Sequence, residues 1–206
     1  GYAIPLVIAI FTIPILIQKL GDEKFGILTL AWVIIGYFSF FDFGIGRALT
    51  KIIAEKIGKK ENDQISSIFW TSFNLMLFIS VFITILLLIL VPYLTNNFFK
   101  ISTLLHDEAL YTFYILIASI PIVTTTAGIR GVLEAYQKFG IINIIRIFLG
   151  ISSFLIPLIC LFFTNNLVWI VFFLAIIKIS IWLLYLNQCF KIDKDLSISL
   201  RFLIVP

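Results

Sequence analysis

Six long apolar segments follow one another along the chain, separated by short polar stretches. They cover residues 2–20, 25–43, 65–94, 109–132, 141–163 and 167–190. A helix that crosses a bilayer needs about 20 mostly apolar residues, whereas a strand of an outer-membrane barrel alternates in polarity over about ten. Each segment is therefore predicted to be a transmembrane helix, and the third is long enough that it must tilt or project from the membrane.

The composition excludes an ordinary soluble domain. Of the 206 residues, 61% are hydrophobic and 13% are charged, whereas soluble domains carry about 25% charged residues. The sequence therefore predicts an all-α, polytopic membrane protein whose six transmembrane helices form one lobe. No zinc-ligand spacing, Walker loop, HExxH motif or Ser-His-Asp arrangement is visible, so we expect no metal site, no catalytic residue and no enzymatic activity.

The basic residues set the expected orientation. The segments after the second, fourth and sixth spans contain Arg47, Lys51, Lys56, Lys59, Lys60, Arg130, Lys138, Arg146, Lys191, Lys194 and Arg201. The segments after the first, third and fifth spans contain only Lys19, Lys24 and Lys100. Because basic loops stay in the cytoplasm, both ends of this chain are expected on the cytoplasmic side.

The two ends of the sequence suggest a longer protein. The chain begins at Gly1, close to the first apolar segment, and it stops at Pro206 just after a new apolar stretch. We therefore expect residues 1–206 to form a single transmembrane helical lobe, with a C-terminal lobe missing from this sequence.

Lys178 is the most unusual charged residue. It lies near the centre of the sixth predicted span, which at 1.5 Å per residue places it roughly 16–18 Å from either interface. A lysine at the centre of a membrane helix costs about 2.5–3.5 kcal/mol. We therefore expect Lys178 to face a cavity or an acidic partner, and not lipid; a misplaced helix boundary is the alternative.

Three arginines lie at or just inside the predicted cytoplasmic ends of the second, fourth and fifth spans. They are Arg47, Arg130 and Arg146. They either anchor the loops in anionic headgroups or form a cationic ring at the mouth of a cavity. A guanidinium group suits a diphosphate because it can form two parallel hydrogen bonds with it. The sequence leaves both interpretations open.

The end of the second predicted span combines an acid with two glycines. Asp42 lies among phenylalanines and is followed by Gly44, Gly46 and Arg47. It is either a buried acid, which would pair with an arginine or couple transport to a cation, or an acid at the membrane boundary. Beyond it, Lys51, Glu55 and Lys59 recur at helical spacing with isoleucines between them. This pattern predicts an amphipathic helix lying along the cytoplasmic interface.

The fourth predicted span contains a proline followed by three threonines. Pro121 tends to bend a helix, and the hydroxyls of Thr124, Thr125 and Thr126 can satisfy the carbonyl groups that a bend frees. The segment is either a site of ordinary helix packing or a bent helix that lines a water-filled cavity, as in transporters.

Several stretches together resemble a known family. The first span contains Pro5 and Pro14, and "LGDEKFGIL" at 20–28, "YFSFFDFGIGRALTK" at 37–51 and "GIRGVLEAYQKFGIINIIR" at 128–146 follow. In these segments the sequence resembles bacterial polysaccharide repeat-unit flippases. These are the O-antigen and capsule transporters of the multidrug/oligosaccharidyl-lipid/polysaccharide (MOP) exporter superfamily. The resemblance covers most of the chain.

The resemblance implies a function and a location. Family members have two six-helix lobes and move undecaprenyl-diphosphate-linked oligosaccharides from the cytoplasmic to the outer leaflet of the bacterial inner membrane. For such a substrate, the positions of the charges make Lys178, Arg47, Arg130 and Arg146 the candidates that bind the diphosphate, and Asp42 the candidate for a coupling or pairing acid. The resemblance implies no cofactor, with coupling to a proton or sodium gradient left open. The expected partners are the lipid-linked oligosaccharide, membrane lipids, and the polysaccharide polymerase and ligase of the pathway, but no nucleic acid.

Three alternatives remain open at this point, and the central Lys178 counts against the first of them, a structural membrane subunit without transport. A multidrug exporter of the same superfamily would favour acids over lysines in its cavity. A membrane glycosyltransferase or polymerase of the same pathway usually needs large external loops that carry acidic residues, whereas the outward loops expected here are short.

Overall fold

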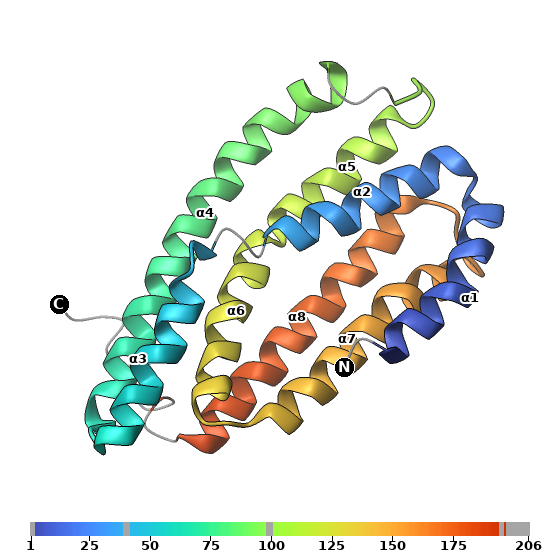
Figure 1. Ribbon diagram of the computed structural model, residues 1–206. Helices are drawn as coiled ribbons and strands as arrows, with labels where there is room; N and C mark the ends of the chain where they lie inside the picture. Colours follow the sequence, from blue (N-terminus) through green and yellow to red (C-terminus); the bar gives the residue numbers. More distant parts are fainter. Residues whose placement is uncertain (1–2, 39–41, 98–100, 194–195, 197–206) are drawn as a thin grey trace.

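The computed structural model describes residues 3–38, 42–97, 101–193 and 196, and within them the chain is helical (Figure 1). The helices are α1 (Ala3–Leu20), α2 (Asp22–Phe38), α3 (Ile45–Lys59), α4 (Ile65–Asn97), α5 (His106–Ala118), α6 (Ile120–Ala135), α7 (Phe139–Cys160) and α8 (Leu167–Ile192). A short 3-10 helix, Asn62–Gln64, precedes α4. The all-α prediction is confirmed.

The helices form one elongated bundle. Helix α4 runs along its whole length, with α5 beside one half and α6 beside the other, and α8 packs on α5, α6 and α7 (Figure 1). Helix α1 packs on α7. One end of the bundle is called the basic end here, because Lys56, Lys59, Lys138 and Lys191 lie there. Helices α3, α6 and α8 finish at this end, and α4 and α7 start there. The other end is called the far end.

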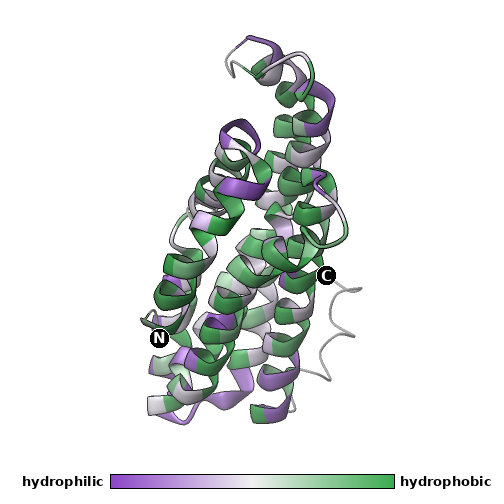
Figure 2. Cartoon of the chain, turned by 90° about the vertical axis from the view of Figure 1, so that its right-hand side faces the viewer, coloured by the Kyte–Doolittle hydropathy of each residue, from purple (hydrophilic) through white to green (hydrophobic). Residues whose placement is uncertain are grey.

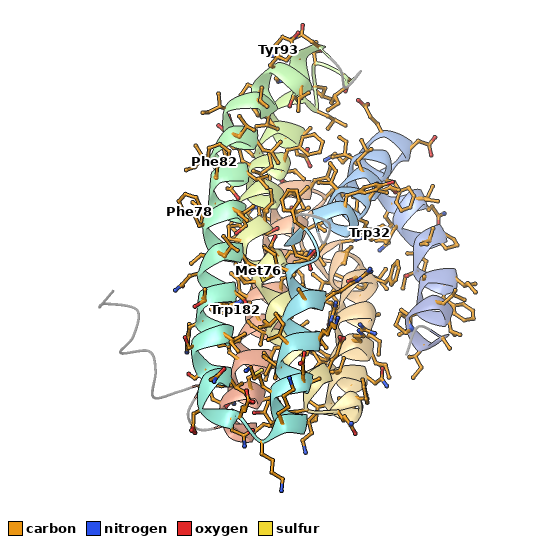
Figure 3. All side chains as sticks on the ribbon, turned by 60° about the vertical axis from the view of Figure 1, so that its left-hand side comes forward. Trp32, Met76, Phe78, Phe82, Tyr93 and Trp182 are labelled. Carbon is orange, nitrogen blue, oxygen red and sulfur yellow. The ribbon has the colours of Figure 1, made fainter. Side chains whose placement is uncertain are left out.

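Hydropathy along the bundle fits a protein that crosses a membrane. Hydrophilic residues gather at the two ends and hydrophobic residues fill the length between them (Figure 2). Phe78 and Phe82 of α4 point away from the bundle and are 74% and 64% exposed (Figure 3). Side chains of this kind are expected to face lipid. The protein is a multi-pass membrane protein.

The count of six spans is wrong by the criteria of helix length and apolarity. Among the described residues, five stretches qualify as membrane spans: Ala3–Leu20, Asn62–Asn97, His106–Ala135, Phe139–Cys160 and Leu167–Ile192. The predicted second span, 25–43, corresponds to α2, which has 17 residues and ends at Phe38. Phe43 and Gly44 adopt positive φ angles of 48° and 79°. Because this conformation is incompatible with a continuing right-handed helix, α3 begins as a separate helix.

The amphipathic helix predicted after the second span exists, but its predicted placement is wrong. It is α3, which runs beside α4 to the basic end and packs on α6 and α4, instead of lying along an interface (Figure 1). Its buried residues are Gly46, Leu49 and Ile53. Small residues allow this contact: a Cβ atom added at Gly131 of α6 would lie 2.8 Å from the carbonyl oxygen of Gly46. The two backbones therefore approach closely, as small residues permit in membrane bundles.

The predicted bend at Pro121 is present as a break between α5 and α6. Helix α5 ends at Ala118, and Pro121 lies in the first turn of α6, where its missing N–H group breaks no hydrogen bond. The Ser119 hydroxyl donates to the Leu116 carbonyl at 2.6 Å, and the Thr125 hydroxyl donates to the Pro121 carbonyl at 2.6 Å. Of the three threonines named from the sequence, Thr125 and Thr126 donate to carbonyls one turn earlier in α6, whereas the buried Thr124 hydroxyl has no hydrogen-bond partner among the described residues.

The core divides into two clusters of buried apolar side chains. One lies toward the far end and includes Leu16, Leu28 and Ile170. The other lies toward the basic end and includes Phe69, Ile129, Leu133 and Ile181. Met76 of α4 is fully buried, and its side chain packs against Gly128 of α6 (Figure 3). A Cβ atom added at Gly128 would lie only 2.8 Å from the Met76 sulfur. These contacts fix α6 against its neighbours.

Candidate binding cavity

A cavity of about 550 Å³ lies between α3, α6, α7 and α8. Four of the five residues predicted as site candidates line it: Asp42, Arg47, Arg130 and Lys178. Helix α6 also contributes Thr126 and Glu134, and α3 contributes Thr50. The bent α5–α6 segment therefore lines a cavity, which is the second of the two interpretations of its sequence.

Lys178 of α8 faces this cavity. Its side chain also borders a narrow gap beside Leu116 and Ser119 of α5. It forms no hydrogen bond or ion pair with any residue that the structure describes. The structure therefore places Lys178 at a cavity, as expected, and not beside an acidic partner.

Arg130 and Arg146 meet at one carboxylate. Arg130 Nε lies 3.3 Å from Glu134 Oε1, and Arg146 Nη2 of α7 lies 3.8 Å from the same oxygen atom. Arg130 and Glu134 are four residues apart on α6, a spacing that places both side chains on one helix face. Arg146 itself does not line the cavity, but it lies beside a residue that does.

Asp42 lies at the break between α2 and α3. Its Oδ1 atom accepts a hydrogen bond from the Gly44 backbone N–H at 3.0 Å, and the residue is half-buried. A carboxylate is favourable here because the start of a helix carries partial positive charge. Arg47 follows in the first turn of α3, lines the cavity, and forms no ion pair within the described part of the chain.

Glu134 is the functional candidate that the sequence prediction missed. Its spacing from Arg130 is a recognisable ion-pair signal in the sequence, but such i,i+4 pairs are common on solvated helix faces. What distinguishes Glu134 is its contact with Arg146, which comes from another helix. Tertiary packing creates that contact, and no local spacing predicts it.

A second group of charged residues lies at the far end of the bundle. Lys24 Nζ of α2 contacts Glu108 Oε2 of α5 at 2.9 Å and donates to the Asn165 carbonyl at 2.8 Å. Glu108 Oε1 also accepts from the Leu167 backbone N–H at the start of α8. Lys24, Glu108, Asn165 and Leu167 are called the far-end cluster here. It joins the starts of α2, α5 and α8.

Glu23 adds a further contact beside the far-end cluster. Its Oε1 atom accepts a hydrogen bond from the Ser102 backbone N–H at 2.7 Å. Hydrogen bonds from the Ser102 side chain and backbone hold the pKa of the Glu23 carboxyl below its ordinary value. This contact ties the α4–α5 connection to the start of α2.

The lining of the cavity favours an anion. The cavity and its immediate surroundings contain Arg47, Arg130, Arg146 and Lys178 as cations, against the carboxylates of Asp42 and Glu134. Among the residues described, no group of three or more His, Cys, Asp or Glu side chains is arranged to hold a metal ion. The arrangement can bind a negatively charged group within an otherwise apolar bundle.

Comparisons with known proteins identify the family. The MatE family model matches residues 6–160. A Shigella flexneri protein named "Putative O-antigen transporter" is 32% identical over 196 residues, which are 94% of this chain and 46% of that protein. This chain thus spans about half the length of that relative. No solved structure matches the chain.

MatE proteins are membrane transporters and not enzymes, so the expected absence of enzymatic activity agrees with the comparisons. The chain belongs to the MatE family, within the MOP superfamily of membrane transporters.

Proposed function

We propose that this chain is part of a flippase that moves undecaprenyl-diphosphate-linked oligosaccharide repeat units from the cytoplasmic to the outer leaflet for O-antigen or capsule synthesis. The observation that carries the proposal is the excess of cations at a cavity inside an apolar bundle, with Lys178 unpaired among the described residues. The likeness to the Shigella flexneri protein named "Putative O-antigen transporter" supports the same class of substrate.

The chemistry of a diphosphate fits this cavity. Lys178 supplies a compact positive charge and Arg47 a planar fork of donors, and both line the cavity without a partner in the described residues. Charge-assisted hydrogen bonds to phosphate oxygens are stronger in a site of low dielectric constant than in water. An exporter of cationic drugs would require an excess of carboxylates, so the charges of this cavity favour the flippase.

The proposed orientation places the basic end in the cytoplasm of a bacterial cell, with the chain in the inner membrane. The lysines at this end support the assignment, because basic segments are retained on the cytoplasmic side. The lipid-linked oligosaccharide would then enter from the basic end, close to Arg130 and Arg146. The polymerase and ligase of the pathway are the proposed downstream partners, and Asp42 is the proposed acid for coupling to a proton or sodium gradient.

Replacing Lys178 tests the proposed function. In the complete protein, Lys178→Ala is expected to lower surface polysaccharide on the order of tenfold or more, because the diphosphate loses an unpaired cation in a site of low dielectric constant. Surface polysaccharide would be measured by gel or by antibody binding, with membrane insertion measured in parallel.

Lys191→Ala is the matched control, since Lys191 is an exposed lysine at the end of the same helix. It is expected to leave surface polysaccharide unchanged. If Lys178→Ala inserted normally and surface polysaccharide did not fall, the cavity would not carry the proposed function.

A further inference from the structure

Glu134 holds an unusual position, because one carboxylate oxygen lies between two guanidinium groups from different helices. Oε1 is 3.3 Å from Arg130 Nε and 3.8 Å from Arg146 Nη2. The Glu134 side chain is 31% exposed, and it lines the cavity in which the proposed function places the diphosphate. A ligand in this cavity can therefore reach the carboxylate.

Both contacts are longer than a well-formed charge-assisted hydrogen bond, which measures about 2.7–2.9 Å between an N–H donor and a carboxylate oxygen. Arg130 Nε is enclosed by protein and has no aligned hydrogen-bond partner, although Glu134 lies beside it. An enclosed donor without an aligned acceptor costs free energy. Neither arginine is therefore fully satisfied by Glu134.

The Glu134 contact is not needed to hold α6 against α7. Helix α6 ends at Ala135 and α7 begins at Phe139, so a short connection already keeps the two helices together. Buried Val132, Leu133 and Ile142 pack in the same apolar cluster beside this connection. A half-exposed carboxylate at these distances adds little stability.

We propose that Glu134 occupies the place of the substrate's diphosphate when the cavity is empty. When a diphosphate binds Arg130 and Arg146, it displaces the Glu134 carboxylate, which pairs again with both arginines when the diphosphate leaves. No bond is made or broken in this exchange of ion pairs. Glu134 is a positioning residue that lowers the affinity of the site for anions. The inference rests on the proposed function for the identity of the anion.

The physical reason for such a residue is turnover. A permeating ion or group must bind well enough to enter a site and weakly enough to leave it. Arg130 and Arg146 without an acid between them would repel each other and would hold a diphosphate too strongly. The Glu134 carboxylate competes with the diphosphate for the same arginine donors. Because both arginines regain a partner when the diphosphate leaves, its release costs less free energy.

Binding of inorganic pyrophosphate to the complete protein in phosphatidylcholine nanodiscs tests the inference. Glu134→Gln keeps the shape of the side chain but removes the competing charge. It is expected to lower the Kd for pyrophosphate about five- to tenfold, within the usual range of coupling between two binding events. Asp107→Asn is the matched control, because it also removes one negative charge, at an 88% exposed side chain of the far end. Its pyrophosphate Kd is expected to equal that of the unmodified protein.

Surface polysaccharide in cells provides the second measurement. Glu134→Gln is expected to lower it although pyrophosphate binds more tightly, whereas Lys178→Ala is expected to lower both binding and polysaccharide. A merely structural role of Glu134 would weaken binding and transport together. Unchanged or weaker pyrophosphate binding by Glu134→Gln would therefore overturn the inference. If this variant does not fold, Glu134→Asp serves in its place, since a shorter carboxylate cannot reach both arginines and is also expected to tighten binding.

Competition by the lipid-linked oligosaccharide separates this inference from the proposed function. If Glu134→Gln tightens pyrophosphate binding but undecaprenyl-diphosphate oligosaccharide does not displace the pyrophosphate, the exchange at Glu134 stands and the proposed substrate is wrong. If the lipid displaces pyrophosphate while Glu134→Gln leaves the Kd unchanged, the proposed substrate stands and the role of Glu134 is wrong.

Discussion

The far-end cluster and the cavity each bring charged side chains of different helices together, and their pairing differs. In the far-end cluster, Lys24 contacts Glu108 at 2.9 Å and a backbone carbonyl at 2.8 Å, and Glu108 accepts a further backbone N–H group. At the cavity, Arg130 and Arg146 share Glu134 at 3.3 and 3.8 Å, and Lys178 has no partner among the described residues. Basic and acidic side chains thus stabilise the fold in the far-end cluster, where their hydrogen bonds are complete. At the cavity their hydrogen bonds are incomplete, so these side chains are available to a ligand.

This comparison predicts that the two places respond in opposite ways to mutation. Removing a charge from the far-end cluster is expected to change stability and leave anion binding alone. Removing a charge from the cavity, as in Lys178→Ala or Glu134→Gln, is expected to change anion binding and leave stability nearly alone.

Glu108→Ala gives the largest expected loss of stability. It leaves the Lys24 side chain, which is 21% exposed, without its acid, and it leaves the Leu167 N–H without its acceptor. The loss is expected to be about 1–3 kcal/mol, allowing for partial solvent screening. Thermal unfolding of the purified protein measures it, and pyrophosphate affinity is expected to remain unchanged. Asp107→Ala at the neighbouring exposed position is the control, and equal melting temperatures for the two variants would contradict a structural role of the cluster.

Gly131→Ala tests whether packing, not charge, holds the cavity side of the bundle. The new methyl group would lie 2.6 Å from Thr50 Oγ1 and 2.8 Å from a backbone oxygen of α3, so α3 must move. Overpacking of this kind costs about 1–3 kcal/mol. The expected loss of stability is smaller than for Glu108→Ala, because the two helices can separate slightly. Gly58→Ala in α3 is the control, since a methyl group there would meet nothing within 4 Å. A melting temperature of Gly131→Ala equal to that of the control would mean that α3 and α6 are not in close contact.

The dependence of stability on pH gives the smallest effect. The pKa of Glu23 lies below its ordinary value of 4.5 because Ser102 donates to the carboxylate. A lowered carboxyl pKa stabilises the fold at pH values above the unfolded pKa, and this contribution is lost as the pH falls through the folded pKa. The melting temperature is therefore expected to fall below about pH 4.5 slightly more for the unmodified protein than for Glu23→Gln. Parallel curves for the two proteins would show that the Ser102 contact does not persist in solution.

The sequence predicted the helical membrane class because long apolar runs leave few alternatives, but it did not predict the number of spans. Lys178 was predictable for the same reason, since the cost of a charge in the centre of a membrane helix requires a cavity or a partner. The placement of α3 was not predictable. Its amphipathic pattern fits a membrane surface as well as a groove beside α6, and only the contact of Gly46 with α6 distinguishes the two.

The composition of the cavity was predictable only in part. Arg47, Arg130 and Lys178 stand out in the sequence as cations within or near apolar segments, and all three line the cavity. Whether an arginine faces inward depends on helix rotation, which the sequence left open. Glu134 was missed because its significance comes from Arg146 on the next helix, a contact that depends on how α6 and α7 are turned toward each other.

The close approach of α3 and α6 has a consequence for how relatives of this protein can diverge. Gly46 and Gly131 both line the cavity, and a methyl group on Gly131 would lie 2.8 Å from the backbone oxygen of Gly46. A smaller side chain at Thr50 would not remove this clash, because the Gly46 carbonyl oxygen would remain in place. The width of the cavity at this point therefore depends on the absence of a side chain at Gly131, while its charge depends on Arg47, Arg130 and Lys178. Evolution can alter the size of the accepted group and the affinity for its charge by separate substitutions.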